Sequence, residues 1–80
     1  MDPRFLALLA RNLPLAGERA LADETRLRDL GLDSMQALEL LLGIEETFGV
    51  ALPDEELNEA TFATAGSLWS VVLVALESSR

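Results

Sequence analysis

Residues 31–41 of this 80-residue chain read GLDSMQALELL, a stretch that places a serine where a turn becomes a helix. Asp33 is suited to cap that helix, because its carboxylate can accept a hydrogen bond from a free N–H of the first turn. Gln36 follows three residues later, at the spacing of a capping box. Ser34 therefore stands at the first helical position, and the apolar spacing that follows predicts a helix over residues 34–48.

The apolar residues of this predicted helix fall on two opposite sides when successive residues are rotated by about 100°. One side suffices for the core, and a chain of 80 residues has little material with which to cover both. We therefore expect the side that carries Met35, Leu38 and Leu42, which acidic residues border, to be an exposed recognition stripe. The alternative is that the preceding connection folds over Met35 and Leu38. The core side contains Ala37, Leu40, Leu41, Ile44 and Phe48, and the bordering acids are Glu39, Glu45 and Glu46.

Three further helical segments are predicted around this one. The first begins at the Asp-Pro pair of residues 2–3 and ends at the Leu-Pro pair of residues 13–14. Residues 14–33 then form a long connection, whose leucines we expect to pin it onto the core. A short helix follows over residues 53–60, and a last helix covers roughly residues 65–77. The leucines of the connection are Leu15, Leu21, Leu27 and Leu30.

These elements predict an all-α fold, since the β-branched run at residues 71–75 has no second strand with which to pair. We expect one domain over residues 1–80, a four-helix bundle with three longer helices, a short third helix and a long loop between the first two. The expected core consists of Phe5, Leu9, Leu27, Leu30, Leu40, Leu41, Ile44, Phe48, Leu57, Leu68, Val72 and Leu76.

The charges of the chain are unevenly distributed. Residues 1–28 carry five arginines against four acidic residues, whereas residues 29–80 carry ten acidic residues against Arg80. Such a field repels nucleic acid and anionic lipid and attracts basic protein surfaces, so we expect no nucleic-acid or membrane partner. The alternative is an acidic face that serves only solubility.

The composition of the chain also excludes several kinds of functional site. Half of the residues are hydrophobic, and the chain contains no cysteine and no histidine. No disulfide or thiolate zinc site is possible, and the acidic residues have neither the spacing of an EF-hand loop nor that of a glycosidase pair, so we expect no metal site and no enzyme activity. The apolar run at residues 5–10 is too short for a membrane span or a convincing signal peptide. We therefore expect a cytoplasmic monomer.

The hydroxyl of Ser34 has no means of activation within the chain. There is no histidine and no lysine, and Asp33, as an adjacent carboxylate, is a weak base for an alkoxide. The position does suit a phosphate ester, because free amides and the positive end of the helix dipole face an anion there. By itself, an Asp-Ser pair before a helix is more often only a cap.

Three segments of the chain together match the pattern of one known family. LGLDSM at residues 30–35 resembles the attachment motif of acyl carrier proteins and related carrier domains. EETFGVALPDEE at residues 45–56 is similar to the family's second-helix end and the loop into its short third helix, and residues 61–72 resemble the start of its last helix. The resemblance covers roughly residues 2–77, and the amino-terminal third matches mainly in its apolar spacing.

The resemblance implies that a separate phosphopantetheinyl transferase moves 4′-phosphopantetheine from coenzyme A onto the hydroxyl of Ser34. The arm ends in a thiol that carries acyl or aminoacyl cargo as a thioester, so the chain would be a non-catalytic carrier. The implied partners are loading and processing enzymes with basic docking surfaces. Six of the seven partner-facing positions that the family implies are also selected by helical spacing, Asp33 being the exception. These positions are Asp33, Met35, Leu38, Glu39, Leu42, Glu45 and Glu46.

Three functions stay open at this point. The first is an acyl carrier in fatty acid, polyketide or related biosynthesis, which Asp33 before the serine favours. The second is a discrete peptidyl carrier that holds an aminoacyl thioester in nonribosomal peptide or specialised metabolite biosynthesis, which the TAGSL sequence at residues 64–68 favours. The third is an unmodified acidic helical adaptor, in which Ser34 only forms part of a helix start.

Overall fold

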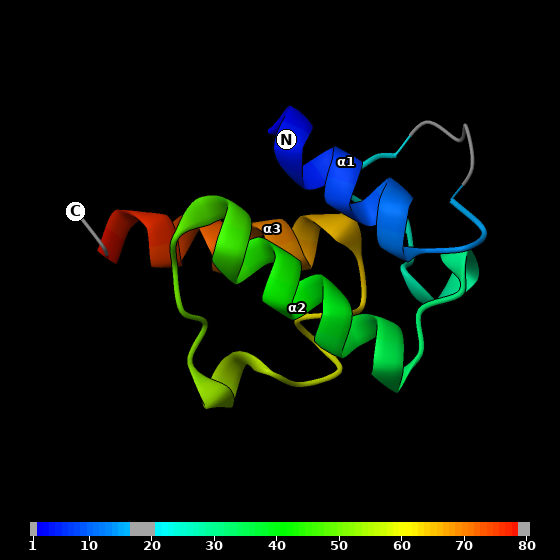
Figure 1. Cartoon of the computed structure of the whole chain (residues 1–80). Helices are drawn as coiled ribbons and strands as arrows, with labels where there is room; N and C mark the ends of the chain where they lie inside the picture. The colour runs from blue at the N-terminus through cyan, green and yellow to red at the C-terminus, as the bar shows by residue number, and fades with distance from the viewer. Residues whose placement is uncertain (1, 17–20, 79–80) are drawn as a thin grey trace.

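The computed structural model describes residues 2–16 and 21–78, and its regular elements are helices (Figure 1). Within these residues the β structure is limited to an isolated bridge between Arg26 and Thr64. The all-α prediction is therefore confirmed. The elements are α1 at Pro3–Asn12, η1 at Arg28–Leu30, α2 at Ser34–Phe48, η2 at Asp54–Glu56 and α3 at Ala65–Ser78, where η denotes a short 3₁₀ turn.

Side chains cap the starts of α1 and α3, and a glycine follows the end of α2. At α1, the Asp2 carboxylate accepts a hydrogen bond from the Arg4 N–H at 2.8 Å, and hydrogen bonds from the Arg4 side chain hold the pKa of Asp2 below its usual value. At α3, the Thr64 hydroxyl accepts from the Ser67 N–H at 3.1 Å, while the Ser67 hydroxyl oxygen accepts from the Thr64 N–H at 3.0 Å. The helix α2 ends at Phe48, and the residue that caps it is Gly49, whose φ of 65° favours glycine.

The predicted short third helix over residues 53–60 is wrong in extent. In the structure only Asp54–Glu56 is helical, as a single 3₁₀ turn. The Asn58 side chain ends it, since its amide donates to the Glu55 carbonyl at 2.9 Å and its Oδ1 accepts from the Thr61 N–H at 2.9 Å. Asparagine competes with the helical backbone in this way. The described residues thus form three α-helices rather than a four-helix bundle.

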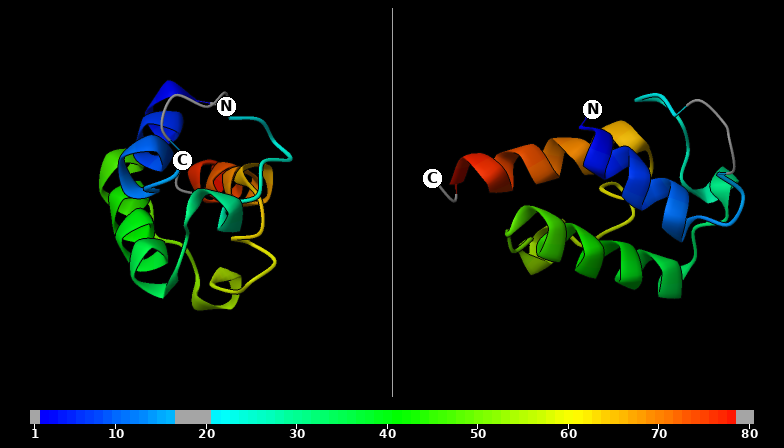
Figure 2. Two further views of the ribbon diagram at one scale, coloured as in Figure 1. Left: turned by 90° about the vertical axis from the view of Figure 1, so that its right-hand side faces the viewer. Right: turned by 45° about the horizontal axis from the view of Figure 1, so that its top comes forward.

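The three α-helices surround one apolar core, and α1 packs directly on α2 (Figure 2). Gly43 lies at this contact, where an added Cβ would come within 3.0 Å of the Leu8 side chain. Trp69 of α3 packs on the same assembly, with ring centroids 4.9 Å from Phe5 and 5.8 Å from Phe48. The aromatic rings thereby join all three helices.

Most of the predicted core is confirmed, but the prediction that Leu57 belongs to it is wrong. Its side chain is 38% exposed, because it follows the η2 turn on a connection instead of lying on the inner face of a helix. The confirmed buried residues are Phe5, Leu9, Leu27, Leu30, Leu40, Ile44, Leu68 and Val72, and Leu41, Phe48 and Leu76 pack partly buried against them. The buried apolar residues outside the prediction are Leu8, Leu13, Ala16, Val50, Leu52 and Ala65.

The long connection before α2 is fastened to the start of α3 by its backbone. Three hydrogen bonds of 3.2, 3.0 and 2.9 Å join residues 23–27 to residues 63–66. Of the four leucines expected to pin this connection, Leu27 and Leu30 are buried and Leu21 is half-buried, as predicted. Leu15 is 60% exposed and does not pin it; only its backbone N–H is tied down, by the Leu30 carbonyl at 2.9 Å.

We expect a Gly66→Ala substitution to lower the free energy of unfolding by about 1–3 kcal/mol. An added Cβ at this position would lie 2.8 Å from the carbonyl oxygen of Asp23 and 3.2 Å from its Cα, and these backbone atoms cannot rotate away. Urea denaturation measures the loss. Gly43→Ala is the matched control, since its Cβ would meet a flexible Leu8 side chain and alanine favours the helix by about 1 kcal/mol. Equal losses in the two variants would contradict this account.

Candidate functional site

Ser34 stands at the first position of α2, as the capping pattern predicts. Asp33 precedes it in an extended conformation, and its Oδ1 accepts a hydrogen bond from the Gln36 N–H at 2.8 Å. The Asp33 carbonyl accepts a second bond, from the Ala37 N–H, also at 2.8 Å. Ser34 itself is exposed, so its hydroxyl is open to an approaching molecule.

The surroundings of the Ser34 hydroxyl favour holding an anion over attacking a substrate. The Asp33 carboxylate caps the Gln36 N–H, and the chain contains no histidine or lysine to act as a base. The first N–H groups of α2 have no helical partners, so the positive end of the helix dipole lies at this serine. A phosphate ester on the hydroxyl would have its negative charge stabilised there.

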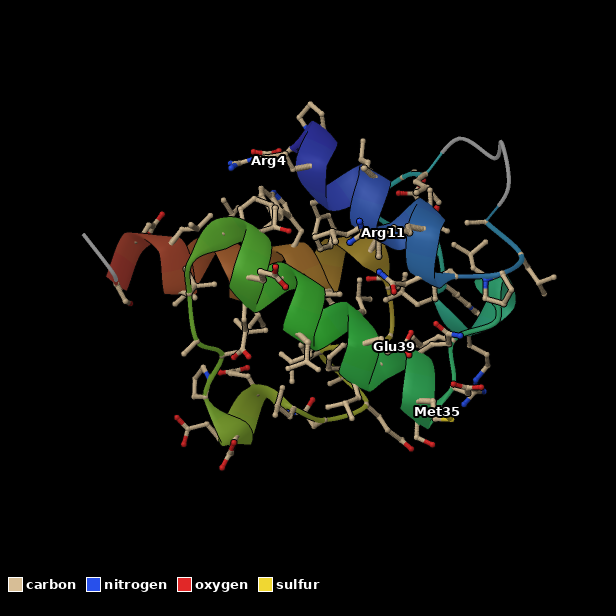
Figure 3. All side chains as sticks on the ribbon, viewed as in Figure 1. Arg4, Arg11, Met35 and Glu39 are labelled. Atoms are coloured by element: carbon tan, nitrogen blue, oxygen red, sulfur yellow. The ribbon has the colours of Figure 1, made fainter. Side chains whose placement is uncertain are left out.

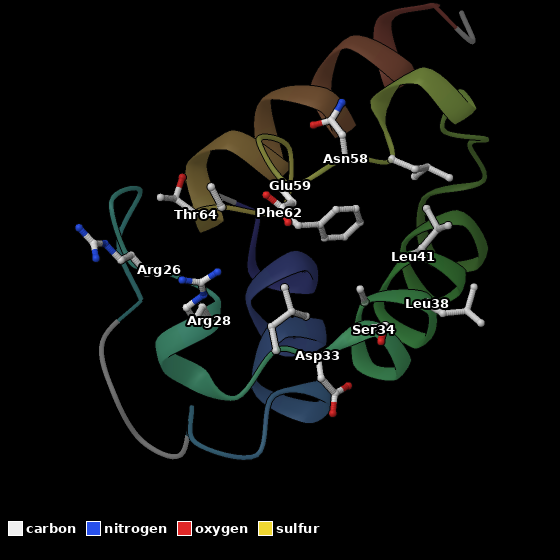
Figure 4. Close-up of a pocket in the computed structure, with 14 residues that line it drawn as sticks. Arg26, Arg28, Asp33, Ser34, Leu38, Leu41, Asn58, Glu59, Phe62 and Thr64 are labelled. Atoms are coloured by element: carbon white, nitrogen blue, oxygen red, sulfur yellow. The ribbon is translucent and has the colours of Figure 1, made fainter.

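An open groove of about 870 Å³ adjoins Ser34, a volume within the range of small-molecule sites (Figure 4). It is lined by the start of α2 and by residues of the connection that leads to α3, among them Phe62. Arg26 and Arg28 line it on the side away from Ser34. Sequence reasoning misses Phe62 and the two arginines, because helical periodicity marks none of them and backbone pairing between distant segments brings them together.

The recognition stripe predicted on α2 is exposed. The side chains of Met35, Leu38 and Leu42 are 73%, 57% and 55% exposed. The described part of the long connection does not bury them, so the alternative in which it covers the stripe is wrong. Glu39 and Glu46 are exposed on the same helix, and Figure 3 shows Glu39 and Met35 on its outer side.

Glu45 differs from the other two acids of α2. It is half-buried, and its Oε2 accepts a hydrogen bond from the Leu52 N–H at 3.1 Å. The carboxylate thereby holds the connection after α2 against the helix. Part of its hydrogen-bonding capacity is used within the chain.

The structure also bears on metal and membrane sites. In the part of the chain that the structure describes, no three carboxylate, histidine or cysteine side chains gather in a way that could hold a metal ion. Likewise, none of the described helices has both the length and the apolar character needed to cross a bilayer.

A family model described as the phosphopantetheine attachment site matches residues 3–69. The chain belongs to this family. Among curated carriers it is similar to an aminoacyl carrier protein of Agrobacterium fabrum, with 39% identity over 60 residues that cover 75% of this chain and 72% of the relative. It is also similar to an acyl carrier protein of Treponema pallidum, with 40% identity over 62 residues that cover 74% and 80%.

Solved structures of carriers show the same architecture. One is the carrier protein from Agrobacterium tumefaciens in complex with an engineered Bradyrhizobium japonicum glycine:[carrier protein] ligase and AMP, which matches with a TM-score of 0.77 and 33% identity over 91% of this chain and 99% of that one. Another is an acyl carrier protein from Thermotoga maritima, with a TM-score of 0.70 and 22% identity, which supports the fold alone.

The chain is therefore a phosphopantetheine-dependent carrier. It bears covalently attached 4′-phosphopantetheine, and the thiol of that group tethers intermediates as thioesters. The residues present fit such a group: Ser34 offers an exposed hydroxyl at an electropositive helix start, and the adjoining groove is lined partly by the apolar side chains of Leu41 and Phe62.

Proposed function

We propose that the Oγ of Ser34 is the atom to which the 4′-phosphopantetheine arm is joined. The observation that carries this proposal is the exposed hydroxyl at the capped start of α2, inside the matched residues 3–69. A phosphodiester at this position lies at the positive end of α2, an arrangement that stabilises a negative charge by about 0.3–1 kcal/mol.

In this proposal the chain positions the Ser34 hydroxyl, and partner enzymes catalyse the reactions. The hydrogen bond from the Gln36 N–H to Asp33 keeps the start of α2 in one conformation, so Ser34 presents its hydroxyl in a defined direction. A separate phosphopantetheinyl transferase supplies the base that removes the hydroxyl proton, since no histidine or lysine exists in the chain. The Ser34 oxygen then bonds to the phosphorus of the arm as the pyrophosphate bond of coenzyme A breaks and adenosine 3′,5′-bisphosphate leaves. The chain is then a non-catalytic carrier.

The exposed stripe of α2 is the proposed docking surface for the transferase and for loading and processing enzymes. Met35, Leu38 and Leu42 offer an apolar centre, and Glu39 and Glu46 offer an acidic border that attracts basic partner surfaces. Asp33 precedes this surface and Glu45 lies beside it on α2, and both also have hydrogen bonds within the chain.

An intact mass spectrum tests the attachment. The purified chain is incubated with coenzyme A and a promiscuous phosphopantetheinyl transferase, and we expect the mass to rise by one 4′-phosphopantetheine, with a free thiol that a maleimide then labels. Peptide mapping should place the added mass on Ser34. An unmodified adaptor would show no added mass, which would contradict the proposal.

The cargo has two candidate classes. An acyl group is the first, supported by the similarity to the acyl carrier protein of Treponema pallidum. An aminoacyl group is the second, favoured by the match over 91% of this chain to a carrier solved with a glycine:[carrier protein] ligase. The carrier that bears the arm but no cargo is incubated with that ligase, glycine and ATP and, in parallel, with an acyl-transferring enzyme and its acyl donor. The class of enzyme that charges the thiol is the class that the result supports.

A further inference from the structure

Two arginines border the groove next to Ser34 in a chain whose formal net charge is −8. Arg26 and Arg28 are both exposed, and Figure 4 shows them on the side of the groove away from Ser34, with the guanidinium of Arg26 extending outward from the groove. Within the described residues the ion pairs comprise Arg4–Asp2 alone, so neither groove arginine is neutralised by a described carboxylate. The two arginines at this groove therefore have no role in ion pairs among the described residues.

The backbone holds both arginines in place. Arg26 forms the isolated bridge with Thr64, and the Arg28 carbonyl accepts a hydrogen bond from the Gly31 N–H at 3.1 Å in the η1 turn. The two side chains consequently extend from anchored positions. An anchored backbone lowers the entropy lost when their charges meet a partner, which is the advantage of a pre-organised contact.

The surface around Ser34 is thus charged with both signs. Glu39 and Glu46 lie along α2 on one side, and Arg26 and Arg28 lie across the groove on the other. Ser34 lines the same groove as the arginines, so an enzyme that reaches its hydroxyl must cover their side of the groove as well as α2. A row of acids alone attracts a basic surface without determining how that surface is turned, whereas two regions of opposite charge determine its orientation.

We propose that the transferase that modifies Ser34 presents carboxylates to Arg26 and Arg28 while its basic groups meet the acids of α2. This inference rests on the proposed function, because it concerns the enzyme that docks over Ser34. This inference and docking through α2 alone predict opposite changes in the rate of modification when the charges of the two arginines are reversed. If the partner surface were purely basic, reversing the arginines would strengthen the long-range attraction and speed modification, whereas paired carboxylates would be repelled and modification would slow.

The test is the kcat/KM of a promiscuous phosphopantetheinyl transferase acting on the full apo chain at low salt. We expect the double variant Arg26→Glu/Arg28→Glu to lower kcat/KM about tenfold, and Arg26→Gln/Arg28→Gln to lower it less. Arg11→Glu controls for charge reversal alone, because Arg11 is an exposed arginine of α1 that does not line the groove, although its guanidinium lies near Gly43 of α2. Its kcat/KM should equal that of the wild type or exceed it by up to about twofold.

Two further measurements make the result decisive. Circular dichroism confirms that the variants stay folded, and the difference between wild type and double variant should shrink as salt rises, because exposed charges are screened. A double variant that is modified as fast as the wild type, or faster, overturns the inference even though Ser34 is still modified. Failure of the transferase to modify wild-type Ser34 at all overturns instead the proposed function.

Discussion

The Ser34→Ala variant is expected to keep its unmodified mass in the presence of coenzyme A and a transferase that modifies the wild-type chain completely. Deleting this one oxygen removes the atom that receives the phosphate, while the cap of α2 stays intact because it depends on Asp33 and the Gln36 N–H. The expected loss of modification is complete, and intact mass spectrometry measures it.

The matched control for this variant is Ser70→Ala. Ser70 is an exposed serine within α3, and its hydroxyl donates to the Gly66 carbonyl of its own helix at 2.9 Å. It should be modified like the wild type. Both variants should unfold within about 0.5 kcal/mol of the wild type, as exposed positions usually do. Addition of the arm to the Ser34→Ala chain would show that another side chain is the attachment point.

The second large effect concerns the two sides of α2. We expect Leu40→Ala to lower the free energy of unfolding by about 2–5 kcal/mol, because Leu40 is fully buried and truncation leaves a cavity. This is a large part of the roughly 5–15 kcal/mol that stabilises a typical domain. The midpoint of thermal unfolding should fall by at least about 8 °C, which calorimetry or circular dichroism measures.

Leu38→Ala makes the same chemical change two residues earlier, on a side chain that is 57% exposed. Its stability should stay within about 0.5 kcal/mol of the wild type, whereas its kcat/KM with the transferase should fall by about fivefold or more if the stripe is the docking surface. The two leucines thereby separate folding from recognition. Equal losses of stability in both variants would contradict the assignment of one inner and one outer side to α2.

The bounds of α2, its cap and its exposed stripe could all be predicted from the sequence. The Asp33 cap, the apolar spacing and Gly49 act within one or two helical turns, so their effect does not depend on the rest of the chain. The stripe of Met35, Leu38 and Leu42 followed from the small size of the chain, which leaves one side of α2 uncovered.

Tertiary structure alone decided the composition of the groove, whereas local hydrogen bonds of Asn58 to Glu55 and Thr61 shortened the third helix. The segment after Pro53 has helical start signals, yet the hydrogen bonds of Asn58 to its neighbours stop the helix after one turn and leave Leu57 exposed. Arg26 and Arg28 reach the groove because residues 23–27 pair with residues 63–66, which lie 36 to 43 positions further along the chain. Periodicity and capping describe contacts within a few residues, so a site assembled by backbone bonds between distant segments appears only once the chain has folded.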